Sequence, residues 1–249
     1  KRIISMHDFD ETPQNLEEIH ARLASKDADI VKIACMANSP HDVTRILRLI
    51  ENSEIPTVGI CMGDMGMPSR ILAGKFGSPF SFATFHHERT IAPGQLSFQD
   101  MTDVYRYESI DQDTEVFGVI ADPVAHSMSP VIHNAGFESM DMNRVYLPFR
   151  IPKDHLNQFI DDAPGLGIRG LSVTIPHKQE VMASLTKIES GAKKIGAVNT
   201  VIFDDGEIVG YNTDLYGAMV SLAEAAGEDP DSQWLKGKRV LLLGAGGVA

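Results

Sequence analysis

The sequence has 249 residues, of which 43% are hydrophobic and 22% charged, a composition typical of a globular protein. Its formal net charge of -12 argues against nucleic acid as a partner, because phosphate contacts need clustered Lys and Arg. No apolar run reaches ~18 residues, so we predict no membrane-spanning helix and no membrane partner. The two cysteines, Cys35 and Cys61, indicate a reducing, cytoplasmic setting. Since the first residue is Lys1 and not Met, we expect that the sequence is truncated at its front.

Residues 1–110 alternate between apolar, β-rich runs and amphipathic helical patterns. The β-rich runs are Arg2–Met6, Ile30–Met36, Pro56–Met62 and Phe80–Phe85. Thr12-Pro13 and Ser39-Pro40 each read as an N-cap followed by a first helical residue. Strand and helix recur about every 25 residues, which predicts βα units and a parallel sheet. Four such units fit an open sheet or part of a (β/α)8 barrel.

A polar, acidic stretch at Tyr107–Glu115 predicts a linker, after which the α/β alternation resumes. The expected strands are Val116–Ile120, Val145–Phe149, Gly170–Thr174 and Lys238–Leu243, with a hairpin formed by Val198–Phe203 and Glu207–Tyr211. The expected helices are Ser129–Met140, Lys153–Ile160, Lys178–Leu185 and Asp214–Ala226, the last of them ended by Gly227.

Three side chains of the first segment have properties suited to catalysis. Lys32 lies inside an apolar strand, where burial would lower the pKa of its amine as a Schiff-base nucleophile requires. An edge-strand lysine whose head group reaches water explains it equally well. His7 ends the first strand and fits a general acid–base or a hydrogen-bonded structural histidine. Arg70 fits a carboxylate-binding residue or a surface arginine.

Four motifs of this segment, in their order and spacing, resemble the second half of type I 3-dehydroquinate dehydratase. They are SMHDFDETP, DADIVKIACM, GMPSRILAGKFGSPFSFAT and APGQLS, and they extend to about residue 108. The resemblance implies that Lys32 forms the imine with the ketone of 3-dehydroquinate. It also implies that His7 abstracts the α-proton and assists loss of the hydroxyl as water. Arg70 and Gln95 would hold the substrate carboxylate and hydroxyls.

This segment departs from the family pattern at two points. The family usually has Ser just before Ala-Pro-Gly-Gln, where this sequence has Ile91, with Thr90 one step earlier. The family's catalytic Glu and a further substrate-binding Arg belong to the first half of the barrel, which lies outside this sequence. We therefore expect the fold of the segment to be the C-terminal half of a (β/α)8 barrel.

The second segment carries polar residues where helices are expected to begin. Ser129-Pro130 reads as an N-cap and first helical residue, although free N–H groups at such a position also attract carboxylates. Lys178 is expected in the first turn of a helix, where the helix dipole opposes its charge and lowers the amine pKa. An exposed lysine that tolerates this cost is the alternative. Asp214 is itself a favourable residue at a helix start.

The ordered motifs of the second segment closely resemble the substrate domain of shikimate dehydrogenase. They are GVI, DPVAHSMSP, HN, SVTIPHK, GAVNT and NTDLYG, within residues 116 to 249. The resemblance implies that Ser127, Ser129 and Thr174 bind the shikimate carboxylate and ring hydroxyls, and that Asn199 also holds ring hydroxyls. Lys178 would carry the proton at the reacting hydroxyl, with Asp214 orienting it. Ser172 stands where bacterial members frequently have Asn.

The last residues form a Gly-rich motif after an expected strand. This run fits the G-x-G-x-x-A pattern of a dinucleotide pyrophosphate site, and it consists of Gly244, Ala245, Gly246, Gly247, Val248 and Ala249. The family resemblance implies NADP as the cofactor.

The two resemblances predict an enzyme of the shikimate pathway of aromatic amino acid biosynthesis. Residues 1–110 would belong to the dehydratase barrel, 111–235 to the substrate domain and 236–249 to the start of a Rossmann domain. The dehydratase product, 3-dehydroshikimate, is the ketone that the dehydrogenase reduces. Alternatives are a catabolic quinate/shikimate dehydrogenase and a non-catalytic regulatory relative. We expect the chain alone to have neither activity.

Overall fold

The computed structural model describes residues 1–85, 92–230 and 233–241. The chain divides into two compact units, Lys1–Arg169 and Gly170–Ala249. Within the described ranges, no helix combines the length and the apolar character that crossing a membrane would need. The fold is α/β, with a parallel sheet at the start of the chain and mixed strand pairing in the second unit.

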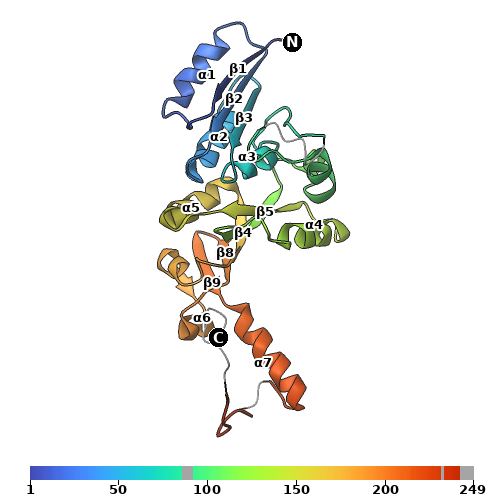
Figure 1. The fold of residues 1–249 in the computed structure, drawn as a ribbon, viewed down its shortest axis with the longest axis vertical. Coiled ribbons are helices and arrows are strands. Elements are labelled where there is room, and N and C mark those ends of the chain that lie inside the picture. The colour runs from blue at the N-terminus through green and yellow to red at the C-terminus, as the bar shows by residue number, and fades with distance from the viewer. Residues whose placement is uncertain (86–91, 231–232, 242–249) are drawn as a thin grey trace. The chain divides into compact units, whose positions relative to one another are not determined.

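The first unit begins with a three-stranded parallel sheet in the order β1-β2-β3. Its strands are β1 (Ile3–Asp8), β2 (Ile30–Met36) and β3 (Thr57–Met62), joined by α1 (Leu16–Ala24) and α2 (His41–Glu51). Both helices pack against the sheet (Figure 1). Since β3 is buried along its whole length and α2 buries its apolar face on it, the predicted βα units are confirmed here.

The predicted start of the first helix at Thr12-Pro13 was wrong, because the Thr12 side chain bonds to the end of β2 and does not cap a helix. Its hydroxyl donates to the carbonyl of Met36 at the end of β2, 2.8 Å away, and α1 begins only at Leu16, after Asn15. α2 begins at His41, one residue later than predicted.

The predicted strand Phe80–Phe85 is also wrong. Its residues form a single isolated bridge, between Thr84 and Ser97, because a loop and not a strand lies beside it. The helix α3 (Met67–Leu72) follows β3 and contains Arg70, for which the sequence indicated a loop-to-helix position without helix bounds.

The remainder of the first unit contains a second parallel pair, β4 (Glu115–Ala121) and β5 (Arg144–Arg150). The helices α4 (Ser129–Ser139) and α5 (Leu156–Asp162) follow these strands, close to the predicted positions. The shorter helical turns of this unit are η2 (Asp100–Val104), η3 (Tyr107–Ser109), η4 (Lys153–His155) and η5 (Ala163–Leu166).

The second unit is built on the strand order β6-β8-β9-β7. Its elements are β6 (Ile168–Val173), which starts just before the division, then η6 (Glu180–Ser184), β7 (Lys187–Ile188), α6 (Ser190–Ile195), β8 (Thr200–Asp204), β9 (Glu207–Tyr211) and α7 (Thr213–Ala226). The predicted hairpin is confirmed: β8 and β9 are antiparallel, and Asp205 and Gly206 at the turn have φ of 44° and 82°. Gly227 ends α7 with φ 69°, as predicted.

The predicted helix Lys178–Leu185 was wrong. The segment forms only the 3-10 turn η6, because Leu185 is extended and Thr186 donates its N–H to the carbonyl of Ile208 in β9. The chain therefore leaves the helical path to pair with β9. The predicted strand Lys238–Leu243 is absent over its described residues, 238–241, and its remainder lies outside them.

Gly118 in β4 tests how closely the first unit is packed. A Cβ there would lie 2.4 Å from the Phe149 ring and 2.5 Å from the carbonyl oxygen of Leu147, whereas a Cβ at Gly136 in α4 meets nothing within 4 Å. We expect Gly118→Ala to lower the free energy of unfolding by about 1–3 kcal/mol through overpacking. Gly136→Ala should raise it by about 0.5–1 kcal/mol, since Ala favours the helix. Urea unfolding followed by circular dichroism measures both, and equal effects would contradict the packing described.

Candidate active sites

Lys32 lies in the central strand of the first sheet and not at an edge. β2 pairs with β1 on one side and β3 on the other, and Lys32 stands opposite Ser5 and Val58. Its neighbours Val31 and Ile33 are fully buried, while Lys32 itself is half-buried. The edge-strand alternative is therefore wrong, and the head group of Lys32 emerges on the face that Ser5 also occupies.

His7 lies on that same face, two residues beyond Ser5. Its Nε2 is 3.2 Å from Nζ of Lys32, and Nζ also lies 4.3 Å from the centroid of the Phe82 ring. Burial, and then the charge of Lys32, lower the pKa of His7. The structure thus brings together an imidazole held in its basic form and an amine, which is the pairing that a general base and a nucleophile require.

Arg70 is not the surface arginine of the alternative reading, because only 2% of it is exposed. It lies in α3, and its Nη2 donates to the carbonyl oxygen of Pro93 at 3.2 Å, while its Nε has no hydrogen-bond partner among the described residues. Burial lowers the pKa of Arg70. A buried guanidinium with a free donor is suited to bind an anionic group that enters from solution.

The charge of Arg70 acts on Lys32. Burial is the larger cause that lowers the pKa of Lys32, and the charge of Arg70 is the second. In the described part of the chain, no carboxylate forms an ion pair with either residue. Both effects increase the fraction of neutral amine, the form that attacks a carbonyl carbon.

The loop that carries Gln95 is held against the end of β3. Gly63 donates its N–H to the carbonyl of Pro93 at 3.1 Å, and Gly94 has φ 68°. A Cβ at Gly94 would lie 2.4 Å from the carbonyl oxygen of Gly63, so the close approach needs glycine. Pro93 therefore binds both Gly63 and Arg70, which places the loop of Gln95 beside Arg70. The departures noted at Thr90 and Ile91 lie outside the described residues.

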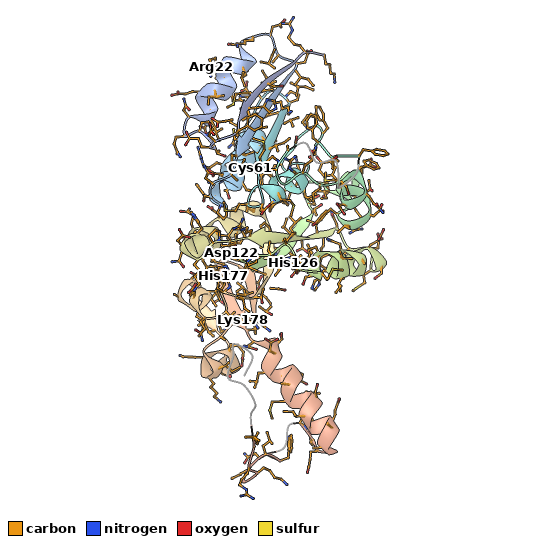
Figure 2. All side chains as sticks on the ribbon, in the orientation of Figure 1. Arg22, Cys61, Asp122, His126, His177 and Lys178 are labelled. Carbon is orange, nitrogen blue, oxygen red and sulfur yellow. The ribbon has the colours of Figure 1, made fainter. Side chains whose placement is uncertain are left out.

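In the second unit the structure brings Lys178 and Asp214 together. Lys178 follows β6, Asp214 lies in the first turn of α7, and Nζ donates to Oδ2 at 2.7 Å (Figure 2 labels Lys178). The Lys178 side chain is 18% exposed and that of Asp214 43%, so the pair faces solvent from one side. The argument from a helix dipole at Lys178 does not apply, because no α-helix begins there.

Asn199 lies beside this pair. Its Nδ2 donates to the hydroxyl of Thr213 at 2.9 Å, and its Oδ1 accepts the N–H of Thr213 at 3.0 Å. Thr174 follows directly after β6 and is exposed. Asn199, Lys178 and Asp214 are therefore neighbours through the start of α7.

Ser127 and Ser129 are described within the first unit. α4 begins at Ser129, whereas Ser129 as the N-cap would make Pro130 the first helical residue. Ser127 Oγ accepts the N–H of Ser129 at 3.3 Å. Ser127 is thus the serine that satisfies a free N–H at this helix start. The Gly-rich run from Gly244 to Ala249 lies outside the described residues.

Sequence reasoning missed Phe82 and Asn212. Phe82 lies over Lys32 although 50 positions separate them in the chain (82 − 32), and no local pattern indicates such a contact. Asn212 caps α7 by accepting the N–H groups of Asp214 and Leu215. An Asn at an expected helix start is a readable signal for this role.

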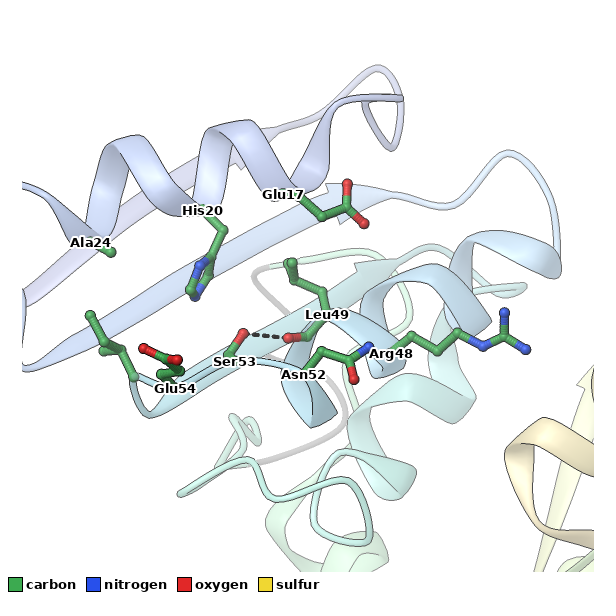
Figure 3. A pocket seen from close by; sticks show the side chains of 9 residues that line it. Glu17, His20, Ala24, Arg48, Leu49, Asn52, Ser53 and Glu54 are labelled. Carbon is green, nitrogen blue, oxygen red and sulfur yellow. Dashed lines mark hydrogen bonds between the residues drawn. The ribbon is translucent and has the colours of Figure 1, made fainter.

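A separate cavity of about 430 Å³ lies between α1 and α2 (Figure 3). It is lined by Glu17, His20, Ala24, Arg48, Leu49, Asn52, Ser53, Glu54 and Ile55. His20 Nε2 lies 2.8 Å from the hydroxyl of Thr57, and burial lowers the pKa of His20. None of the residues selected from the sequence lines this cavity, so it is distinct from both candidate sites.

Comparison with known proteins identifies two families along the chain. The family model of type I 3-dehydroquinase matches residues 1–112, and that of the shikimate dehydrogenase substrate binding domain matches residues 119–201. The first range contains all four motifs quoted for the dehydratase, and the second contains most of those quoted for the dehydrogenase domain, although NTDLYG at 212–217 lies beyond it.

Individual relatives match over different lengths. The Arabidopsis thaliana protein named bifunctional 3-dehydroquinate dehydratase/shikimate dehydrogenase, chloroplastic, is 38% identical over 259 residues, covering 100% of this chain and 43% of the relative. The shikimate dehydrogenase (NADP(+)) of Methanocaldococcus jannaschii is 45% identical over 140 residues, covering 56% of this chain and 48% of the relative. A solved structure of dehydroquinate dehydratase and shikimate dehydrogenase from S. pombe is 28% identical, with a TM-score of 0.40, and the match covers 90% of this chain and 43% of that one.

The chain thus spans less than half the length of these relatives. Both matched families occur in their expected order, and the Arabidopsis relative aligns along the entire chain. Residues 1–112 therefore match the type I 3-dehydroquinase family and residues 119–201 the shikimate dehydrogenase substrate binding domain, and the chain as a whole is similar to a bifunctional protein that joins the two.

Proposed function

We propose that the chain contributes to two consecutive reactions of the shikimate pathway. The first is dehydration of 3-dehydroquinate to 3-dehydroshikimate, and the second is NADPH-dependent reduction of 3-dehydroshikimate to shikimate. The observation that carries the proposal is the 3.2 Å contact between Lys32 and His7 beside buried Arg70, on a chain that also holds the Lys178–Asp214 pair.

In the dehydration, neutral Lys32 attacks the ketone carbon of the substrate. The C–N bond forms and the carbonyl oxygen leaves as water, giving an imine that withdraws electrons from the adjacent carbon. His7 then takes the proton from that carbon, and the hydroxyl on the next carbon leaves as water. Hydrolysis of the imine releases the product and restores the amine.

Arg70 and Gln95 would bind the substrate in this reaction. The Arg70 guanidinium has an unsatisfied Nε and no carboxylate partner among the described residues, so a substrate carboxylate would complete its hydrogen bonding. Gln95 would bind hydroxyl groups from the adjoining loop. In this proposal the sheet β1-β2-β3 and its helices are the C-terminal half of a (β/α)8 barrel.

In the reduction, NADPH would supply, when bound, the hydride that the ketone carbon accepts. The ammonium of Lys178 donates the proton to the developing alkoxide, and Asp214 holds that ammonium 2.7 Å from its carboxylate. The resemblance supports Ser127, Ser129, Thr174 and Asn199 as groups that bind the substrate.

The cofactor would bind at the Gly-rich run that starts at Gly244. The support is the sequence motif and the similarity to the M. jannaschii relative, which is named shikimate dehydrogenase (NADP(+)). The domain limits proposed are 1–110, 111–235 and 236–249. We also propose a cytoplasmic location, although the Arabidopsis relative is named chloroplastic.

Imine trapping tests the first reaction. In protein that includes the complete barrel, 3-dehydroquinate with borohydride should add the mass of the reduced adduct to the peptide that contains Lys32. Lys32→Ala should abolish the adduct, while Lys26→Ala, an exposed control, should not. Absence of any adduct would favour the non-catalytic alternative, and an adduct on another lysine would contradict the role of Lys32.

Substitution of Lys178 tests the second reaction. In protein with the complete cofactor domain, Lys178→Met should lower kcat for 3-dehydroshikimate reduction by on the order of 10²–10⁴-fold, the usual contribution of general acid catalysis. Dehydratase activity should not change. The matched control is Lys193→Met, which removes an exposed lysine of α6. Unchanged kcat in Lys178→Met would contradict the role, and a wild-type preference for NAD and quinate would favour the catabolic alternative.

The 249-residue chain by itself should have neither activity. It spans 43% of the Arabidopsis relative, and the family's catalytic Glu belongs to the barrel half outside this sequence. Incubation of the chain with 3-dehydroquinate, monitored by the absorbance of the enone product, checks this. Measurable dehydratase turnover would overturn it.

A further inference from the structure

Asn212 precedes α7, and its side-chain amide both accepts and donates hydrogen bonds. Its Oδ1 accepts the backbone N–H of Asp214 at 3.0 Å and of Leu215 at 3.3 Å. Its Nδ2 donates to the carbonyl oxygen of Ala197 at 3.0 Å. The first two bonds cap the helix, whereas the third joins the start of α7 to a separate segment of the second unit.

These contacts close a ring that includes the Lys178–Asp214 pair. Val198, the residue after Ala197, donates its N–H to the backbone carbonyl of Lys178 at 2.7 Å. Lys178 Nζ donates to Asp214 Oδ2 at 2.7 Å, and the N–H of Asp214 donates to Asn212. Both residues of the pair are therefore held at their backbone by one segment, 197–198, and Asn212 is the side chain that makes the connection to Asp214.

Thr213 is held as well, so the backbone of the whole turn is constrained. Its N–H donates to Oδ1 of Asn199 at 3.0 Å, and its hydroxyl accepts from Nδ2 of Asn199 at 2.9 Å. Ala197 and Val198 are buried, which keeps the segment that anchors Asn212 in place. Asp214 has little freedom to move away from Lys178 while these bonds persist.

We propose that Asn212 is a positioning residue for the proposed dehydrogenase reaction, fixing Asp214 so that Lys178 is held at the reacting oxygen. This inference rests on the proposed function of the Lys178–Asp214 pair. The role needs an acceptor and a donor on one short side chain. Alanine offers neither, and serine offers a helix cap but no amide N–H directed at Ala197.

The contrast between these two variants separates positioning from simple capping. In protein with the complete cofactor domain, Asn212→Ala should lower kcat by on the order of 100-fold with a small change in KM, because the misplaced donor acts in the transition state. Asn212→Ser should be more stable than Asn212→Ala, because serine still caps α7. Its kcat should nevertheless stay almost as low as that of Asn212→Ala. The control is Glu189→Ala, since Glu189 caps α6 by accepting the N–H groups of Gly191 and Ala192 and forms no hydrogen bond with Lys178 or Asp214 among the described residues.

A second readout does not depend on activity. Acetylation of Lys178 in the chain, followed by mass spectrometry, should be several-fold faster in Asn212→Ala and Asn212→Ser than in wild type, because the ammonium is no longer held by Asp214. The exposed Lys193 and Lys194 serve as internal references, and Glu189→Ala should leave the Lys178 rate unchanged.

The outcomes distinguish this inference from the proposed function. If Asn212→Ser restores both kcat and the slow acetylation, or if Glu189→Ala reproduces the effects of Asn212→Ala, the positioning role is overturned. If acetylation accelerates as expected but wild-type protein reduces no 3-dehydroshikimate, the proposed function fails while the fixing of the pair by Asn212 is supported.

Discussion

The first candidate site depends on the proximity of two cationic groups without a compensating carboxylate among the described residues. Arg70 is buried, and the pKa of Lys32 is lowered first by the partial burial of Lys32 itself and then by the charge of Arg70. Such an arrangement is costly for a folded protein unless a ligand relieves it. A keto acid substrate would do so in two ways, since its carboxylate neutralises the guanidinium and its carbonyl carbon reacts with the amine. The position of Lys32 in a central strand makes the arrangement rigid, because both neighbouring strands fix its backbone.

Lys178, the lysine of the second candidate site, has a negatively charged neighbour where Lys32 has a positively charged one. Lys178 donates a hydrogen bond to a carboxylate oxygen 2.7 Å away, whereas no carboxylate pairs with Lys32 among the described residues. One chain thus contains a lysine that is paired with a carboxylate and another that lies near a second cation. The difference matches the two proposed roles, nucleophile and proton carrier, and it follows from neighbouring charges and not from the residue type.

The sequence was sufficient where local pattern determines structure, as in the parallel strands of residues 1–62 and the hairpin at Asp205-Gly206. It was insufficient where distant partners decide. The segment expected to form a helix from Lys178 makes only a 3-10 turn because Thr186 pairs with β9, and Thr12 bonds to the end of β2 and not to a helix. Among site residues, motifs selected Lys32, His7, Lys178 and Asp214, but the burial of Arg70, the Phe82 contact and the bond from Asn212 to Ala197 depend on tertiary packing.

The most direct test of the central claim is the titration of Lys32 itself. An NMR titration of the ¹³C-labelled ε-carbon of Lys32 should give a pKa below the ordinary value of 10.5. Arg70→Met should raise that pKa, since removing a neighbouring positive charge favours the ammonium, whereas Arg70→Lys, which keeps the charge, should change it less. An ordinary pKa for Lys32, or one that does not respond to Arg70→Met, would contradict the claim that these two neighbouring cations define the site.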